Sequence, residues 1–179
     1  MILWCCTHKT TQTSTNELPY LNLNDSVQYV GMQACISCHK DVHDDYKLTG
    51  MGQSFDFATK EKSAGVYDQH ALVFDSIKNF YYQPFWNGDT MKLREFRLLG
   101  SDTIYQRVET IHYIVGSGQH TNSHMTQING YLYQAPITYY TQKGQWDLPP
   151  GYENGNNSRF DRTIGIECMT CHNHLPQFD

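Results

Sequence analysis

The sequence lacks several features that mark common classes of protein. Its 179 residues contain no apolar run of about eighteen, the length that a transmembrane helix needs. They contain no run of Lys and Arg of the kind found in polybasic membrane patches. The net charge of −5 argues against a nucleic-acid partner, which would require a basic stripe. Apolar residues make up only 39% of the chain, below the usual share, so we expect a small conventional core.

Cysteine is scarce, but four of the six cysteines lie in two copies of one pattern. The stretches Cys35-Ile36-Ser37-Cys38-His39 and Cys168-Met169-Thr170-Cys171-His172 both read C-x-x-C-H, the attachment pattern of c-type haem. In that pattern two thiols bond covalently to the haem, and the histidine that follows is the proximal ligand of the iron. We therefore predict two haem c groups, attached through Cys35, Cys38, Cys168 and Cys171, with His39 and His172 as proximal ligands.

Two other kinds of site also use C-x-x-C pairs. Two pairs can together hold one zinc ion, and a single pair can be the redox dithiol of a thioredoxin-like fold. Neither requires a histidine directly after the second cysteine, whereas both copies here have one. Haem attachment is therefore the preferred interpretation. The 13 tyrosines agree with it, since aromatic side chains pack well against a porphyrin.

Residues 1–25 have the composition of an export segment followed by a tether. The first six residues, MILWCC, look like the end of a signal peptide and resemble a degenerate lipobox, in which Cys6 or Cys5 would carry a lipid anchor. Residues 7–16 are almost entirely polar, as in a flexible linker. Residues 26–179 are expected to form a dihaem cytochrome c domain. Because haem c is attached outside the bacterial cytoplasm, we predict a periplasmic protein or one anchored to the outer membrane.

The residue pattern predicts an α+β fold, with short haem-bearing helices and an antiparallel meander and hairpins packed around two haems. Residues 34–48 are expected to form a helix with Gly50 near its end. Four segments between residues 70 and 115 are rich in aromatic and β-branched residues and are separated by turn residues, which indicates a meander that walls the haem site. Asn129-Gly130 predicts a type I′ hairpin that joins residues 121–128 to 131–137. Pro136 predicts that the second of these strands lies at a sheet edge or ends there.

A six-coordinate haem iron also needs a ligand on its distal face. Three histidines within thirteen residues, around Gly116-Ser117-Gly118, are the richest source. A methionine between Gly50 and Gly52 is another, because a thioether is an accepted axial ligand and the two glycines would let the backbone approach a haem. An ordinary structural or surface role is the alternative for each candidate. The candidate distal ligands are His112, His120, His124, His70 and Met51.

The loop of residues 145–160 and the segment after it supply candidates for other haem contacts. Arg159 and Arg162 precede the second motif, where a guanidinium could pair with a haem propionate. Trp146 and Tyr152 are candidates to pack against a haem edge. A solvated arginine is an equally reasonable interpretation of each basic residue.

Several blocks of sequence resemble a group of bacterial multihaem cytochromes c. YVGMQACISCHKDVHDDYKLTGMGQSF is similar to the opening of members of the superfamily of the nitrifier tetrahaem cytochrome and its c-prime-beta relatives, and HYIVGSGQHTNSH, INGYLYQAPITYY, GQWDLPPGY and IECMTCHN follow in that group's order. The resemblance implies an exported or lipid-anchored protein that continues into further haem motifs or tetratricopeptide repeats. This chain shows neither and stops at Asp179, soon after His172, so we expect a longer natural polypeptide. The resemblance also implies a histidine where Met51 stands, which leaves that ligand role open.

These expectations together predict electron transfer through two covalently attached haems, with a redox partner protein docking at an exposed haem edge. Axial ligands, burial and nearby charge would set the iron potentials. The alternative is a haem enzyme or small-ligand-binding protein, in which one iron lacks a distal protein ligand and binds a nitrogen oxide, hydroxylamine or peroxide. A third interpretation is a haem-bearing assembly module that binds its partners through a further region of the polypeptide.

Overall fold

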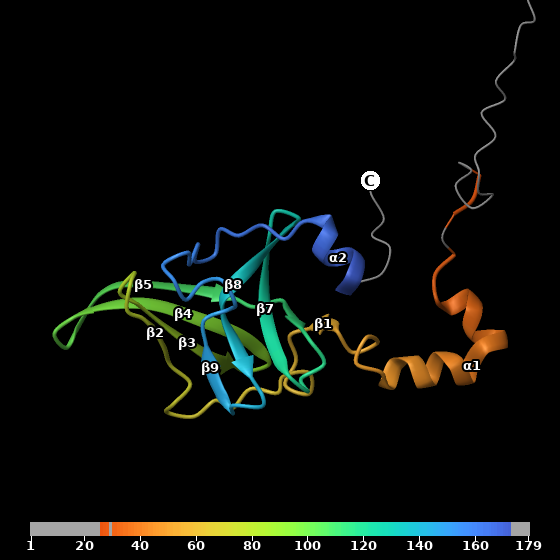
Figure 1. Ribbon diagram of the computed structural model, residues 1–179, viewed down its shortest axis with the longest axis horizontal. Helices are drawn as coiled ribbons and strands as arrows, with labels where there is room; N and C mark the ends of the chain where they lie inside the picture. Colours follow the sequence, from red (N-terminus) through yellow and green to blue (C-terminus); the bar gives the residue numbers. More distant parts are fainter. Residues whose placement is uncertain (1–25, 29, 173–179) are drawn as a thin grey trace, which may run out of the picture. The chain divides into compact units, whose positions relative to one another are not determined.

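The computed structural model describes residues 26–28 and 30–172 of the chain. The chain divides into two compact units, Met1–Lys40 and Asp41–Asp179. Helix α1 (Gln33–Leu48) begins in the first unit and ends in the second. The remaining elements, coloured from yellow to blue in Figure 1, belong to the second unit. The described elements therefore make a mixed α and β structure in which antiparallel strands predominate.

Helix α1 forms where the sequence predicts a helix, beginning one residue earlier. The amide and hydroxyl groups of Thr49 both donate to the carbonyl oxygen of Tyr46, and these bonds close the last turn. Helical geometry is interrupted at His39, where φ is −122° and ψ is 38°. None of the sixteen residues of α1, all of them described, is buried. Because most helices gain their stability by packing an apolar face, α1 depends mainly on its own backbone bonds.

Residues 73–110 fold as the predicted antiparallel meander. Strands β2 (Val73–Asp75), β3 (Phe80–Asn87), β4 (Thr90–Leu99) and β5 (Asp102–Thr110) form a four-stranded sheet in chain order. The turns fall at predicted residues, since Asn79, Gly88 and Gly100 have positive φ values of 55°, 61° and 60°. Every second residue at the start of β3 is buried, so one face of this sheet meets the core.

A second antiparallel sheet has the strand order β1-β6-β7-β8-β9. Its strands are β1 (Phe55–Phe57), β6 (Tyr113–Val115), β7 (Thr121–Ile128), β8 (Tyr131–Tyr140) and β9 (Gln145–Asp147). Asn129 and Gly130 join β7 to β8 with φ values of 51° and 84°, as a type I′ turn requires. The predicted hairpin is therefore confirmed.

Strand β8 overturns the prediction made from Pro136. The strand runs on to Tyr140, and it lies between β7 and β9 rather than at an edge. On one side of β8, the pairing register with β7 shifts between Ser123 and Met125. On the other side, the partner of β8 changes from residue 163 to strand β9. Proline has no N–H to donate, and it fits here because the ladder is interrupted on both sides of it.

Both sheets contribute to one apolar core. Its members come from the meander, from β6, β8 and β9, and from the loops that join them. They are Ala71, Val73, Phe80, Tyr82, Met91, Leu93, Ile111, Ile114, Ala135, Ile137, Tyr139, Trp146, Leu148, Tyr152 and Phe160. Burial of each large apolar side chain stabilises the fold by about 1.5–3 kcal/mol. Within the described part of the chain, no cysteine or histidine of either C-x-x-C-H motif belongs to this core.

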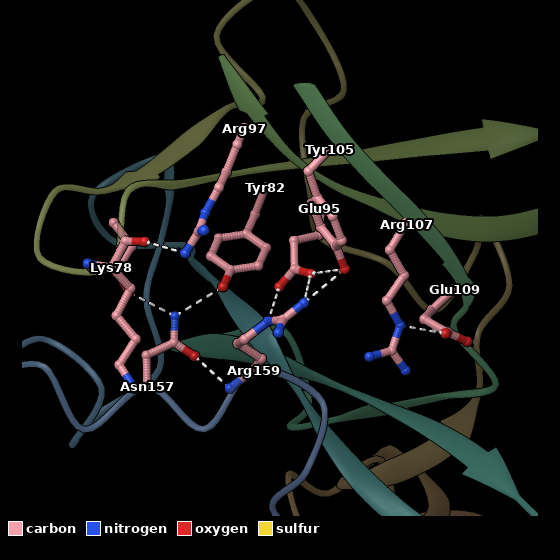
Figure 2. Close-up of polar contacts among 10 residues, drawn as sticks. Lys78, Tyr82, Glu95, Arg97, Tyr105, Arg107, Glu109, Asn157 and Arg159 are labelled. Atoms are coloured by element: carbon pink, nitrogen blue, oxygen red, sulfur yellow. Dashed lines mark hydrogen bonds and ion pairs between the residues drawn. The ribbon is translucent and has the colours of Figure 1, made fainter. Parts of the chain in front are cut away.

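A polar cluster fastens the C-terminal loop to the meander (Figure 2). Glu95 of β4 is fully buried, and Arg159 donates to both of its carboxylate oxygens, from Nε at 2.8 Å and from Nη2. The same Nη2 lies 2.7 Å from the hydroxyl of Tyr105, which donates to Glu95 at 3.1 Å. Asn157 of the same loop donates to the hydroxyl of Tyr82 at 3.0 Å. The hydrogen bonds with Glu95 raise the pKa of Arg159, so the buried carboxylate faces a permanent positive charge.

Replacing Arg159 with leucine should lower the free energy of unfolding by about 3 kcal/mol, because Glu95 would stay buried with one hydroxyl as its partner. We take the lower end of the range for a broken buried ion pair because Arg159 itself is partly exposed. Urea unfolding followed by tryptophan fluorescence measures the loss. The matched control is Lys60→Met, which removes the exposed ion pair with Asp89 and should cost less than about 1 kcal/mol. Equal losses in the two variants would refute the prediction.

Candidate functional site

The first C-x-x-C-H motif lies in the first half of α1, in the unit Met1–Lys40. Cys35 and Cys38 are three residues apart, so their side chains share one side of the helix. Both thiols are free and exposed, and His39 is exposed as well. His39 is also the residue at which helical geometry breaks. A large planar group can therefore reach both thiols without displacing a buried side chain.

The second motif forms the end of helix α2 (Ile166–His172), drawn in dark blue in Figure 1. Cys168, Cys171 and His172 occupy positions i, i+3 and i+4, which lie on one side of a helix. Cys168 is partly exposed, and Cys171 and His172 are exposed. The helix begins with bonds from the amides of Cys168 and Met169 to the carbonyl oxygen of Gly165. Both predicted motifs thus stand on helices with their thiols accessible.

The second motif opens onto a cavity of about 320 Å³, which we call the His172 cavity. Three segments that are distant in sequence supply its walls: the turn after α1, the loop before β7 and the end of α2. The lining residues are Gly50, Met51, Ser54, Gly116, Ser117, His120, Thr121, Cys171 and His172. Two of the five candidate distal ligands, Met51 and His120, therefore meet the second motif in one place.

Hydrogen bonds hold the three walls of the His172 cavity together. The hydroxyl of Ser54 donates to the carbonyl oxygen of His172 at 3.1 Å, and the carbonyl oxygen of Ser54 accepts from the amide of Gly116 at 2.6 Å. The ammonium group of Lys62 donates to the carbonyl oxygens of Gln53 and, at 2.8 Å, of Gly116. Burial lowers the pKa of Lys62, and the carboxylate of Asp56 opposes that shift. These bonds fix the backbone of the segments that carry Met51 and His120.

His120 is the better supported of the two candidates in the cavity. Its carbonyl oxygen accepts from the amide of Thr141 at 2.9 Å, so its backbone is fixed. Its ring Nδ1 lies 2.8 Å from Nε2 of Gln142, so a side-chain partner holds the ring. Met51 is 58% exposed, and its backbone carbonyl accepts from the amide of Ser54.

Of the two glycines beside Met51, Gly52 has a structural role of its own. A Cβ atom on Gly52 would lie 2.1 Å from the carbonyl oxygen of Tyr46. Gly52 is therefore needed where the chain turns back against the end of α1. A Cβ on Gly50 would have only an ordinary contact with Ser117.

His112 is held by a contact that opposes iron binding. Its Nδ1 accepts from the backbone amide of Gln127 at 3.0 Å, and the hydroxyl of Thr126 lies 3.4 Å away. A neutral imidazole whose Nδ1 accepts a hydrogen bond carries its proton on Nε2. That nitrogen is then a donor rather than a free ligand. Among the described residues, His112 is also outside the lining of the His172 cavity.

His124 lies inside the core rather than at the surface. It is fully buried, it packs 5.1 Å from the ring of Trp146, and it sits at the register shift of β7. Neither ring nitrogen has a hydrogen-bond partner within the described part of the chain. Burial lowers the pKa of His124 to about 4. The backbone of Ile137 opposes that shift, although its geometry falls short of a hydrogen bond. Iron ligation by His124 would require the core to open.

His70 lies in a turn before β2, which begins at Val73. Its amide donates to the carboxylate of Asp68 at 2.8 Å, which shapes the turn. Its ring Nε2 is 3.4 Å from the side-chain amide of Gln69. As far as the described residues go, His70 does not line the His172 cavity.

Three of the four other predicted haem contacts, Arg159, Trp146 and Tyr152, have structural partners. Arg159 is bound to Glu95, so it is not free to pair with a propionate. Trp146 is buried and donates to the carbonyl oxygen of Val66 at 2.7 Å, and Tyr152 is buried in the core. The meander is also absent from the described lining of the His172 cavity, contrary to the predicted haem wall. The proposed anchor residues Cys5 and Cys6 lie outside the described residues.

A second cavity of about 480 Å³ is lined by Met169 of α2 and by residues of the second sheet. Tyr113 stacks on Phe55 and Phe57 there, with ring centroids 5.0 and 5.4 Å apart. The sequence did not point to these aromatic residues, nor to Ser54, Lys62 or Gln142. Ser54, Phe55 and Tyr113 stand near the candidates Met51 and His112 in sequence, but only tertiary contacts show what each residue bonds or packs against. Ser117 lies between the two glycines already singled out, so that pattern did point to part of the lining.

Searches against protein-family models, curated proteins and solved structures found no match to this chain. Within the described residues, no group of three or more His, Cys, Asp and Glu side chains is placed to hold a metal ion. None of the described helices is long and apolar enough to cross a membrane.

The burial of His124 predicts a loss of stability in mild acid. The pKa of its ring is about 4 in the folded chain and about 6.5 in the unfolded chain. Between these values the unfolded chain binds a proton that the folded chain does not bind. The stability due to the neutral ring is therefore fully present above about pH 6.5 and is lost as the pH falls towards 4. The full shift corresponds to roughly 3 kcal/mol.

Urea unfolding at about pH 7 and about pH 5 measures this loss. The variant His124→Phe has no titrating group at this position, so its stability should change less between the two conditions. His70→Phe is the matched control, because His70 is exposed, and it should keep the wild-type difference. An unchanged difference in His124→Phe would show that another group is responsible.

Proposed function

We propose that this chain is a c-type cytochrome that transfers electrons through two covalently attached haems. Cys35 and Cys38 would hold one haem, with His39 as the proximal ligand of its iron. Cys168 and Cys171 would hold the other, with His172 as its proximal ligand. The proposal combines the two C-x-x-C-H motifs with the placement of the second motif in the structure.

The observation that carries the proposal is the composition of the His172 cavity. Cys171 and His172 share this cavity with His120 and Met51, although they are at least 51 positions away from each of these two in the sequence. A C-x-x-C-H site supplies the thiol anchors and one axial ligand, and the second axial ligand must come from elsewhere in the chain. Histidine and methionine both serve as that second ligand in cytochromes, and this cavity offers one of each, His120 and Met51.

The residues present fit a haem on two further counts. The thiols of both motifs are accessible, so attachment disturbs no core contact. The His172 cavity is at the lower end of the volume range of cofactor sites. A macrocycle bound at Cys168 and Cys171 would therefore keep part of its rim outside the cavity. An exposed rim is what a redox partner protein needs for electron transfer.

The proposed location and further modules of the protein rest on the resemblance to multihaem cytochromes c. We propose an exported protein of the periplasm or outer membrane, anchored by a lipid on Cys6 or Cys5. As the resemblance implies, the polypeptide would also carry further haem motifs or tetratricopeptide repeats. The haem c groups would supply reversible one-electron chemistry, and the protein would set their potentials through ligands and burial.

Intact mass spectrometry tests the proposal directly. The full chain, matured in a bacterial periplasm that carries the haem-attachment machinery, should gain the mass of two haems. The double variants Cys35→Ser/Cys38→Ser and Cys168→Ser/Cys171→Ser should each lose one haem and keep the other. A wild-type chain without haem, or one carrying zinc, would overturn the proposal.

Electron paramagnetic resonance tests the distal ligand of the second haem. If His120 binds its iron, the oxidised wild-type protein gives a low-spin signal, and His120→Ala converts one haem to high spin. Met51→Leu is the matched variant in the same cavity and should leave the spin state unchanged. The opposite result would assign Met51 instead. A strong high-spin signal in the wild type would favour the haem enzyme with an open iron.

A further inference from the structure

Within the described residues, the contact between His120 and Gln142 is the one side-chain hydrogen bond that the structure gives to the two candidate ligands of the His172 cavity, His120 and Met51. His120 directly precedes β7, and Gln142 lies in the turn after β8. The pairing of Thr121 with Tyr140 brings the ends of these two strands together. The amide of Thr141 then bonds to the carbonyl oxygen of His120. Backbone pairing thus sets the side chain of Gln142 beside Nδ1 and not beside Nε2.

An imidazole binds iron through one nitrogen, and the hydrogen bond at the other nitrogen determines which one is free. When Nδ1–H donates to an oxygen, Nε2 has an open lone pair, the ring is fixed in orientation and the ligand becomes more basic. When Nδ1 accepts, the proton stands on Nε2 and blocks it. The partner of Nδ1 therefore decides whether a histidine can be a ligand.

Gln142 differs from the partner of His112 in this respect. The amide of Gln142 presents its NH₂ group to His120 at 2.8 Å, and a half-turn of its last torsion presents the carbonyl oxygen at the same place. His112 receives a backbone N–H from Gln127, which cannot be exchanged for an acceptor. Of these two histidines, His120 alone can keep its partner and free Nε2.

We propose that Gln142 is a positioning residue for a haem ligand: its side-chain oxygen accepts from Nδ1–H of His120 and directs Nε2 into the cavity that Cys171 and His172 line. This inference rests on the proposed haem at the second motif. It adds a residue outside the cavity lining, and it assigns to that residue control over the strength of the distal ligand. Gln142 would act through His120 and would not touch the iron.

The experiment compares three variants of the full, haem-loaded chain. Gln142→Leu removes the acceptor, and Gln142→Glu supplies a stronger, charged acceptor. Gln145→Leu is the matched control, because it changes an exposed glutamine of β9 three residues away. Mass spectrometry first confirms that each protein carries both haems. The reduction potential and the affinity of the oxidised haem for added cyanide are then measured on the haem whose signal His120→Ala alters.

The proposal expects opposite effects in the two Gln142 variants. In Gln142→Leu the weaker ligand gives a higher potential and lets cyanide displace His120 about tenfold more readily, the lower end of the effect of losing such a partner. In Gln142→Glu the more basic ring lowers the potential and weakens cyanide binding. Gln145→Leu should match the wild type in both measurements.

Three outcomes would overturn this inference. The first is unchanged potential and cyanide affinity in both Gln142 variants, on a protein that carries its haems. The second is a shift in the same direction in both variants, which would indicate a change in packing rather than in ligand basicity. The third is a wild-type spectrum that His120→Ala leaves unaltered. A wild-type protein without haem at the second motif would instead refute the proposed function itself, and mass spectrometry separates that case from the other three.

Discussion

The hydrogen bonds of Ser54 are the constraint on which the candidate site depends. Ser54 is nearly buried, and its three polar groups bond to three places in the chain. Its amide bonds to Met51, its carbonyl oxygen accepts from Gly116, and its hydroxyl donates to the end of α2 at His172. Lys62 adds a charged donor to the carbonyl oxygens of Gln53 and Gly116. Residues far apart in sequence become neighbours because these backbone groups must find partners when they leave water.

Local sequence chemistry predicted much of the fold. Helix α1, the meander and the Asn129-Gly130 hairpin were found because each depends on residues next to one another in the chain. A turn that needs positive φ selects Asn or Gly whatever the rest of the fold does. The prediction that β8 lies at an edge or ends at Pro136 was wrong. The missing N–H of a proline matters only where a neighbouring strand would accept a hydrogen bond from it. The interruptions on both sides of it are set by the partners of β8, which its own sequence does not reveal.

The sequence alone could not distinguish among the candidate distal ligands. His112, His120 and His124 lie close together in sequence, and the pattern could not rank them by their surroundings. In the folded chain one accepts a backbone N–H, one faces the His172 cavity and one is buried against Trp146. Arg159 shows the same limit, because its partner Glu95 is 64 residues away. Exposure and hydrogen-bond partners come from tertiary contacts, whereas the C-x-x-C-H pattern involves only neighbouring residues and is visible in the sequence alone.

The separation of the motifs from the core has a consequence for maturation of the protein. The core is built from the two sheets and their loops, and neither described helix buries a residue. The sheets can therefore form without the motifs, since their apolar contacts do not include them. Covalent attachment requires thiols that an enzyme can reach, and short helices without buried side chains open at little cost. If haem is attached as proposed, the two sheets would act as a rigid support, and α2 would settle against them through Ser54 after its thiols react. The sheets would then set the strength of the distal ligand through His120 and Gln142, and the helix bearing the motif would not.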